Sequence, residues 1–143
     1  MAIGIGSWFV KGENRSLGTM RTRESRFDFV LRPRLESLDL PLAILVDGCS
    51  ASTSEILAAG LRDLGRARIF GTQTAGATLP STFVRLPNGD GFQYASADYV
   101  SASGLRLEGR GLIPDVIVRQ SRQKLIAGRD AVIDAALQWI AAE

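Results

Sequence analysis

The chain has 143 residues, a length that suits one domain and leaves little room for two. Hydrophobic residues make up 45% and charged residues 22%, a composition that excludes a collagen-like, coiled-coil or disordered chain. The formal net charge is +2, from 17 Lys and Arg against 15 Asp and Glu, and this small excess does not indicate nucleic acid or an anionic membrane surface as a partner.

Several residue types are scarce in ways that limit the chemistry. There is no histidine, and the only lysines are Lys11 and Lys124, so the two commonest nitrogen bases are absent from most of the chain. The single cysteine, Cys49, excludes an internal disulfide, and nothing near it in the sequence favours a thiolate, so we expect a small core residue there. No run approaches the roughly 18 apolar residues of a membrane-spanning helix, and residues 1–10 lack the basic region and cleavage site of a signal peptide.

The first part of the chain predicts a strand and loop excursion. Residues 17–23 and 26–31 partly alternate apolar and polar side chains, which indicates half-exposed strands in a hairpin or loop. Acidic residues are interspersed among the arginines of this region, so a solvated face is favoured over a patch for an anionic partner. These arginines are Arg15, Arg21, Arg23, Arg26, Arg32 and Arg34.

The central segment predicts a strand, a helix and a second strand. Residues 41–46 form a continuous apolar run that ends at Asp47-Gly48, a pattern typical of a strand buried on both faces of a sheet. Residues 52–64 place one apolar stripe at helical spacing, with Gly60 allowing close approach, and residues 67–70 predict the second strand. If the two strands are parallel, their crossover is right-handed.

The C-terminal third predicts a hairpin, a short strand and a helix. Residues 81–86 and 92–100 are β-prone and flank Asn88-Gly89, which accepts a positive φ cheaply. Residues 116–118 predict a last strand, and residues 130–140 predict an amphipathic helix. Its apolar face consists of Val132, Ile133, Ala136, Leu137 and Ile140. We therefore predict one compact α/β unit with a mixed sheet.

The most informative segment runs from Asp47 to Ile56, through a turn of small residues into the start of the central helix. The hydroxyl of Ser52 would lie at the helix N-terminus, where unpaired N–H groups and the helix dipole favour negative charge. An oxyanion formed when a serine attacks an amide needs such donors, and the Thr53 N–H is the natural candidate. Ser52-Thr-Ser-Glu55 is also a capping box, and the local pattern alone favours capping.

The run from Pro41 to Gly71, with Ser50-Ala-Ser-Thr-Ser-Glu-Ile56 inside it, resembles the core of the tail-specific, or C-terminal-processing, serine peptidases. Three further pieces agree in order: Thr74-Ala-Gly76, Leu86-Pro-Asn-Gly89 and Glu108-Gly-Arg-Gly-Leu-Ile-Pro-Asp-Val116. The resemblance implies a fold like that of crotonase and the caseinolytic peptidase, with ββα units wound into a superhelix. It also implies that Ser52 is the nucleophile.

Two departures from the family concern the general base. Its best-known branch carries a Thr-Phe-Gly-Lys-Gly motif whose lysine is the base, followed by a supporting glutamine, but Ala77 and Ser81 occupy these positions here. The tricorn-type branch instead uses an upstream histidine and an acidic residue before a Gly-Xaa-Xaa-Pro-Asp motif, to which Glu108 corresponds. Glu108 is thus either a base-orienting acid or an exposed loop carboxylate near Arg106 and Arg110, and we expect the base to come from outside this chain.

The resemblance also implies a fold that is incomplete at its N-terminus. In the family an Asp-Leu-Arg-Xaa-Asn-Xaa-Gly-Gly segment, which supplies the second oxyanion donor, usually precedes the helix that residues 2–10 resemble. We expect a helix remnant and strand excursion over 1–39, the core with the nucleophile helix over 40–118, and a C-terminal helical segment over 119–143. A truncated reading frame, an engineered fragment or a split protein would explain this.

The expected function is hydrolysis of peptide bonds in protein substrates, with the isolated chain inactive or very weak. One alternative is a peptidase-like domain that has lost catalysis and binds peptides or protein partners in the same groove; another is a crotonase-like acyl-thioester enzyme. The expected partner is a protein or peptide substrate, with the missing upstream part of the domain as a further candidate. We expect no cofactor, metal, nucleic acid or membrane insertion. A longer precursor would be periplasmic or secreted, although this chain carries no export signal.

Overall fold

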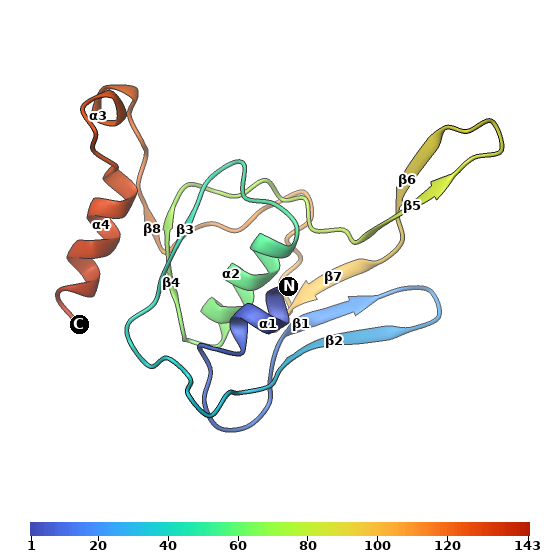
Figure 1. The fold of residues 1–143 in the computed structure, drawn as a ribbon, viewed down its shortest axis with the longest axis horizontal. Helices are drawn as coiled ribbons and strands as arrows, with labels where there is room; N and C mark the ends of the chain where they lie inside the picture. The colour runs from blue at the N-terminus through green and yellow to red at the C-terminus, as the bar shows by residue number, and fades with distance from the viewer.

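The computed structural model describes residues 1–143 and contains four helices and eight strands (Figure 1). In chain order they are α1 (Ala2–Gly6), β1 (Arg15–Arg21), β2 (Arg26–Leu31), β3 (Ala43–Val46), α2 (Thr53–Asp63), β4 (Arg68–Gly71), β5 (Ser81–Arg85), β6 (Gly91–Ala95), β7 (Asp98–Ser101), β8 (Val116–Ile117), α3 (Arg122–Ile126) and α4 (Ala131–Ile140). The predicted α/β class is confirmed, and parallel and antiparallel pairing occur in separate sheets.

The first sheet is antiparallel, with the strand order β2-β1-β7. The predicted hairpin of β1 and β2 is confirmed, with pairing from Arg15–Leu31 to Arg21–Arg26. The predicted strand over residues 92–100 is wrong in its extent, because it divides into β6 and β7, which belong to different sheets. Ser96 lies between the two strands, and its N–H donates to the Pro80 carbonyl at 2.9 Å.

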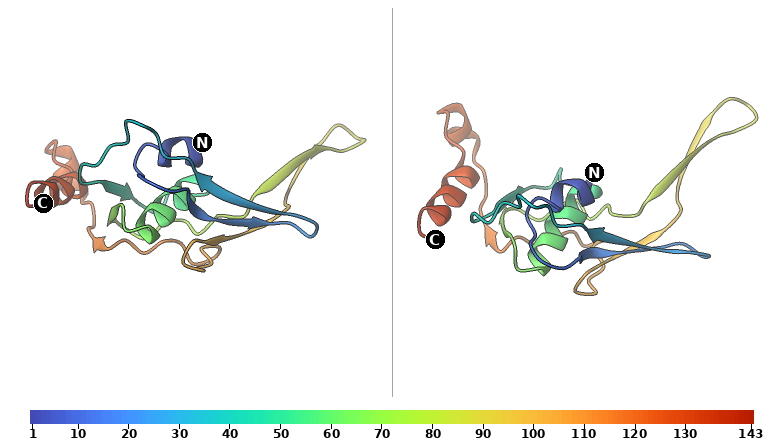
Figure 2. Two further views of the ribbon diagram at one scale, coloured as in Figure 1. Left: turned by 90° about the horizontal axis from the view of Figure 1, so that it is seen from below. Right: turned by 60° about the horizontal axis from the view of Figure 1, so that its bottom comes forward.

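The second sheet is parallel, with the strand order β3-β4-β8. The strand, helix and strand predicted for the central segment correspond to β3, α2 and β4. α2 and the C-terminal α4 lie on opposite sides of this sheet (Figures 1 and 2), and the rings of Phe70 and Trp139 lie 5.6 Å apart between β4 and α4. The expectation that β3 is buried on both faces is wrong, because Leu45 remains 43% exposed beside a helix of only ten residues.

The core lies where α2 packs against β1 and β7. Gly60 allows the close approach that its position predicted, since a Cβ atom there would lie 2.6 Å from the Leu17 side chain. The buried Tyr99 joins β7 to β1 by donating its hydroxyl to the Leu17 carbonyl at 2.7 Å. Burial, with a smaller contribution from the charge of Asp63, raises the pKa of Tyr99 well above its usual value.

The third sheet is the hairpin of β5 and β6, which extends away from the rest of the molecule (Figures 1 and 2). Its pairing runs from Ser81–Ala95 to Arg85–Gly91, so the predicted hairpin is confirmed in this part. An isolated two-stranded hairpin is marginally stable in water. The hairpin therefore depends for its position on the two segments that connect it to the rest of the chain, at residues 80 and 96.

The C-terminal helix α4 is capped by Asp130, whose carboxylate accepts the N–H groups of residues 132 and 133 at 2.8 and 3.1 Å. The predicted apolar face is only partly buried: Ala136 packs inward, whereas Ile133 and Leu137 remain 45% and 58% exposed. Trp139 contacts β4 through Phe70, and the buried residues of the helix are the small Ala131 and Ala136. None of the helices is long and apolar enough to cross a membrane.

Candidate active site

Ser52 lies at the junction of β3 and α2 and is exposed to solvent. Its backbone has φ 59° and ψ −124°, and it is the only residue other than glycine with a positive φ. This backbone conformation costs a residue other than glycine on the order of 1–3 kcal/mol, so the surrounding structure must hold Ser52 in it. The Asp47 carboxylate supports the turn before it by accepting the N–H groups of Cys49 and Ser50 at 2.9 and 3.1 Å.

The Thr53 N–H is the amide in the first turn of α2 that has no acceptor in the protein. The three amides of residues 54–56 donate to the carbonyls of Ala51 and Ser52 at distances of 3.0–3.2 Å. The Thr53 N–H, next to the Ser52 side chain, therefore remains available to a ligand oxygen. The helix dipole adds partial positive charge at the same point.

The predicted capping box is present, with the Glu55 carboxylate accepting the Ser52 N–H at 3.1 Å. The other half of the box, between the Ser52 hydroxyl and the Glu55 N–H, is loose, because that N–H donates to the Ser52 carbonyl at 3.0 Å. Capping thus uses the Glu55 side chain more than the Ser52 hydroxyl. The interpretation of this segment as a helix cap and its interpretation as a catalytic site are therefore compatible.

Glu55 also joins α2 to residues 72–80, which we call the 72–80 loop. Its fully buried carboxylate accepts the N–H groups of Gly76 and Ala77 at 2.9 and 3.0 Å and the hydroxyl of Thr74. Together with the Ser52 N–H, four donors surround a carboxylate that has no cation beside it. Sequence reasoning identified Glu55 as a cap but missed this second role, because the partners lie about twenty residues away.

Ala77, which the resemblance aligns with the family's lysine, lies directly against Ser52. The Ser52 N–H donates to the Ala77 carbonyl at 2.9 Å, and Ala77 itself is exposed. Its methyl group cannot accept a proton, and neither lysine of the chain replaces it. Lys11 pairs with Asp39 near the opposite end of α2, and Lys124 lies on α3, beyond the parallel sheet (Figure 1).

Glu108 holds the next part of the 72–80 loop. Its carboxylate accepts the N–H groups of Thr78 and Leu79 at 2.7 and 3.0 Å. The expected neighbour Arg106 is instead paired with Asp98. Glu108 is exposed, as one of its two interpretations required, but it binds the backbone amides of the two residues that follow Ala77.

Two motifs that are far apart in sequence meet at a pair of glycines. The Gly109 N–H donates to the Gly76 carbonyl at 2.8 Å, and a Cβ atom on Gly76 would lie 2.6 Å from the Gly111 nitrogen. Both Gly76 and Gly111 have φ 69°, so only glycine fits either position without strain. The segments around Thr74-Ala-Gly76 and Glu108-Gly-Arg-Gly111 therefore form one structural unit with the Ser52 turn, whereas Leu86-Pro-Asn-Gly89 lies at the tip of the β5–β6 hairpin.

Two other sequence-based expectations concern side chains near the site. Cys49 was expected in the core but is exposed, because it lies in the turn before Ser52 and outside the packed strand and helix. Ser81, which the resemblance aligns with the family's glutamine, begins β5, and its hydroxyl accepts a hydrogen bond from the side-chain amide of Gln93 at 2.6 Å. No group of three acidic or cysteine side chains has the arrangement of a metal site.

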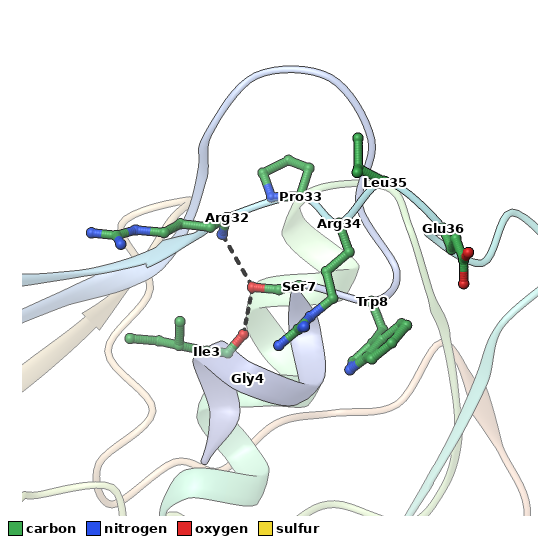
Figure 3. A pocket seen from close by; sticks show the side chains of 9 residues that line it. All are labelled: Ile3, Gly4, Ser7, Trp8, Arg32, Pro33, Arg34, Leu35 and Glu36. Carbon is green, nitrogen blue, oxygen red and sulfur yellow. Dashed lines mark hydrogen bonds between the residues drawn. The ribbon is translucent and has the colours of Figure 1, made fainter.

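A cleft of about 660 Å³ lies elsewhere, between α1 and residues 32–36 (Figure 3). The guanidinium of Arg34 lies 4.6 Å from the ring centroid of Trp8 on one wall. The Ser7 hydroxyl supports this wall by donating to the Ile3 carbonyl at 2.7 Å. The lining includes no residue of the Ser52 turn or the 72–80 loop, so this cleft is separate from the candidate site.

Comparison with known proteins identifies similar chains. The model of peptidase family S41 matches residues 2–118. A carboxy-terminal-processing protease of Bartonella bacilliformis is 34% identical over 134 residues, covering 92% of this chain and 30% of that protein. A carboxyl-terminal-processing protease of Picosynechococcus sp. is 39% identical over 82 residues, covering 57% of this chain and 20% of that protein.

A solved structure supports the same grouping. The photosystem II D1 C-terminal processing protease superposes with a TM-score of 0.71 and 27% identity, covering 82% of this chain and 30% of that one. The chain thus spans less than a third of the length of each of these proteins.

Proposed function

Because the chain belongs to peptidase family S41, we propose that it is the nucleophile-bearing part of a serine peptidase that hydrolyses peptide bonds in protein substrates. The observation that carries the proposal is the pairing of an exposed Ser52 at φ 59° with an adjacent Thr53 N–H that has no acceptor. A strained serine beside an unused amide donor suits attack on a carbonyl carbon.

In the proposed reaction the Ser52 oxygen attacks the carbonyl carbon of the scissile bond, while a base takes the hydroxyl proton. The carbonyl oxygen becomes negatively charged and accepts the Thr53 N–H. Collapse of this intermediate breaks the C–N bond, the departing amine takes the proton from the base, and water then hydrolyses the acyl-serine ester. Losing one oxyanion donor typically costs about 3–4 kcal/mol in barrier height, so the amide of Thr53 would make a large contribution.

The base in this proposal comes from outside the chain. Ala77 occupies the position beside Ser52 where a lysine would act, and there is no histidine. Glu108 is the weaker candidate in the site and would orient such a base through the loop that it holds at Thr78 and Leu79. An upstream part of a longer protein is the proposed source, and such a protein would act in the periplasm or outside the cell.

The second candidate function is a peptidase-like domain that binds peptides or protein partners without cleaving them. Ala77 favours it, because a methyl group at the base position is what loss of catalysis would leave. The two candidates differ in whether the Ser52 hydroxyl becomes reactive when a base is supplied.

A restored base tests the proposal directly. We expect the Ala77→Lys variant to react with a fluorophosphonate at Ser52 at least about 10²-fold faster than the unaltered chain, since general-base catalysis commonly contributes that much. The Ala77→Met variant, which is close to lysine in length but has no amine, is the control. The Ser52→Ala variant removes the hydroxyl that reacts with the fluorophosphonate. Mass spectrometry of peptide fragments locates the adduct.

Labelling of Ser52 in Ala77→Lys alone supports a latent peptidase site. Equal and slow labelling of the lysine and methionine variants contradicts the proposal and favours the binding domain. Labelling that persists in Ser52→Ala contradicts the assignment of the nucleophile.

A further inference from the structure

A cleft of about 500 Å³ lies between the base of the β5–β6 hairpin and the turn that joins β1 to β2. Leu79 and Glu108 line it on one side, and Arg21 and Arg23 line it on the other. The segment from Ala95 to Asp98, where the chain passes from β6 to β7, completes the lining together with Thr22 and Arg106. The proposed reaction assigns no role to Arg21 or Arg23.

Arginines outnumber carboxylates in the lining of the cleft, with Arg21, Arg23 and Arg106 against Asp98 and Glu108. Neither Arg21 nor Arg23 has a carboxylate within ion-pairing distance. Asp98 lies opposite Arg21 in the register of β7 and β1, but its carboxylate forms its salt bridge with Arg106. The Glu108 carboxylate binds the amides of Thr78 and Leu79 through one oxygen, Oε2, and pairs with neither of these arginines. The two guanidinium groups are therefore available to an anion from outside.

The turn that carries these arginines is held in one conformation. The Thr22 N–H donates to the Ser25 carbonyl at 2.9 Å, and the Thr22 hydroxyl accepts the N–H of Ser25 at 2.9 Å and that of Glu24 at 3.2 Å. These bonds fix the backbone between Arg21 and Arg23. Binding an anion there costs less conformational entropy than it would on a mobile loop.

The cleft is close to the nucleophile. Leu79 is two residues from Ala77, whose carbonyl accepts the Ser52 N–H, and two residues of extended chain span at most about 7 Å. A polypeptide that lies across Ser52 and follows the 72–80 loop would reach the cleft within a few residues. The side chain that enters it meets Arg21 and Arg23, neither of which has an ion pair.

We propose that this cleft is a subsite for a carboxylate of an extended polypeptide substrate, supplied by an Asp or Glu side chain a few residues from the bond at Ser52. This inference rests on the proposed function, which supplies the polypeptide. A free C-terminal carboxylate carries the same chemical group, so the experiment separates the two sources.

The experiment measures binding of short fluorescent peptides to the Ser52→Ala chain by anisotropy. One peptide has an amidated C-terminus and a single Glu, placed at each position in turn; a second replaces Glu by Gln; a third is the Gln peptide with a free C-terminal carboxylate. We expect the best Glu peptide to bind about fivefold more tightly than its Gln counterpart, the size expected for a partly exposed charge pair.

Two double variants identify the cleft as the cause. Arg21→Gln with Arg23→Gln should reduce the Glu preference to near onefold, whereas Arg119→Gln with Arg122→Gln, which removes equal charge from exposed positions near α3, should preserve it. Added salt should weaken the preference in the unaltered protein. All four arginines are exposed, so the variants should fold.

Three results overturn the proposal. They are a Glu preference that survives the loss of Arg21 and Arg23, equal binding of the Glu and Gln peptides, and no binding of any peptide. A preference for the free C-terminal carboxylate alone also overturns it, in favour of a chain-end site. Equal peptide binding together with labelling of Ser52 in Ala77→Lys contradicts the cleft alone. A retained Glu preference with an unreactive Ser52 contradicts the peptidase alone and leaves a carboxylate site in a peptide-binding domain.

Discussion

Glu55 controls the geometry around Ser52 more than any other side chain. Its buried carboxylate accepts hydrogen bonds from Ser52, Thr74, Gly76 and Ala77. We expect Glu55→Gln, which keeps the shape but turns an N–H₂ group toward N–H donors, to lower the free energy of unfolding by about 3 kcal/mol. Urea denaturation measures this change.

A matched substitution is available at Glu108, an exposed carboxylate that binds amides of the same loop. We expect Glu108→Gln to cost less than about 1 kcal/mol, because water can solvate the amides it releases. Equal stability of the Glu55→Gln variant and the unaltered chain would show that the buried carboxylate does not hold the loop.

At the level of single residues, the sequence predicted what depends on near neighbours. The small-residue turn and the capping pattern correctly indicated Ser52 at a helix N-terminus. The contacts of Glu55 with the 72–80 loop and of Glu108 with Thr78 could not be predicted, because they depend on segments that meet only in the folded chain. Cys49 was misplaced because residue type alone suggested burial, whereas the residue lies in the exposed turn that follows the correctly predicted end of β3.

Among the elements, α2 is the one whose packing determines where Ser52 lies. It contacts β1 at Gly60, where the nearest atoms to an added Cβ include the Leu17 Cα at 2.8 Å. We expect Gly60→Ala to lower the free energy of unfolding by about 1–3 kcal/mol, since overpacking against backbone outweighs the roughly 1 kcal/mol gain in helix propensity. Chemical denaturation measures the change.

Gly4, in α1, provides the comparison, because a Cβ atom there would meet nothing within 4 Å. Gly4→Ala should leave stability unchanged or raise it slightly. A Gly60→Ala variant as stable as Gly4→Ala would contradict close packing of α2 on β1.

Element positions were predicted well where the pattern was local and less well where burial depended on the partner. The periodicity of residues 52–64 correctly indicated α2, and Asn88-Gly89 correctly indicated the β5–β6 turn. The outward position of Ile133 and Leu137 was missed, because an amphipathic pattern does not specify how much of its face a neighbour covers. The division of residues 92–100 between two sheets likewise depends on pairing with β1.

For the whole molecule, the buried Tyr99 makes the free energy of unfolding depend on pH in the alkaline range. The folded state raises the pKa of this phenol, whereas in the unfolded chain it would ionise near pH 10. Its contribution to stability is therefore complete below about pH 10 and decreases as the pH rises further, because the unfolded state releases its proton first. We expect the free energy of unfolding to fall above that pH.

Measurement of the free energy of unfolding across this range in two variants tests the assignment. Tyr99→Phe should remove the Tyr99 part of the slope, at the cost of the hydrogen bond to the Leu17 carbonyl. Tyr94→Phe, at an exposed position in the hairpin, should retain it. An unchanged slope in Tyr99→Phe would contradict a buried, protonated phenol.

The arrangement of the whole chain around Ser52 leads to one requirement, a proton acceptor from elsewhere. The most direct test is the rate at which a fluorophosphonate labels Ser52 of the unaltered chain at neutral pH, with and without added imidazole, with the adduct located by mass spectrometry. We expect slow labelling that increases in proportion to the imidazole concentration, because a free base then replaces the absent one. Rapid labelling of Ser52 without imidazole, or adducts confined to other serines, would contradict this.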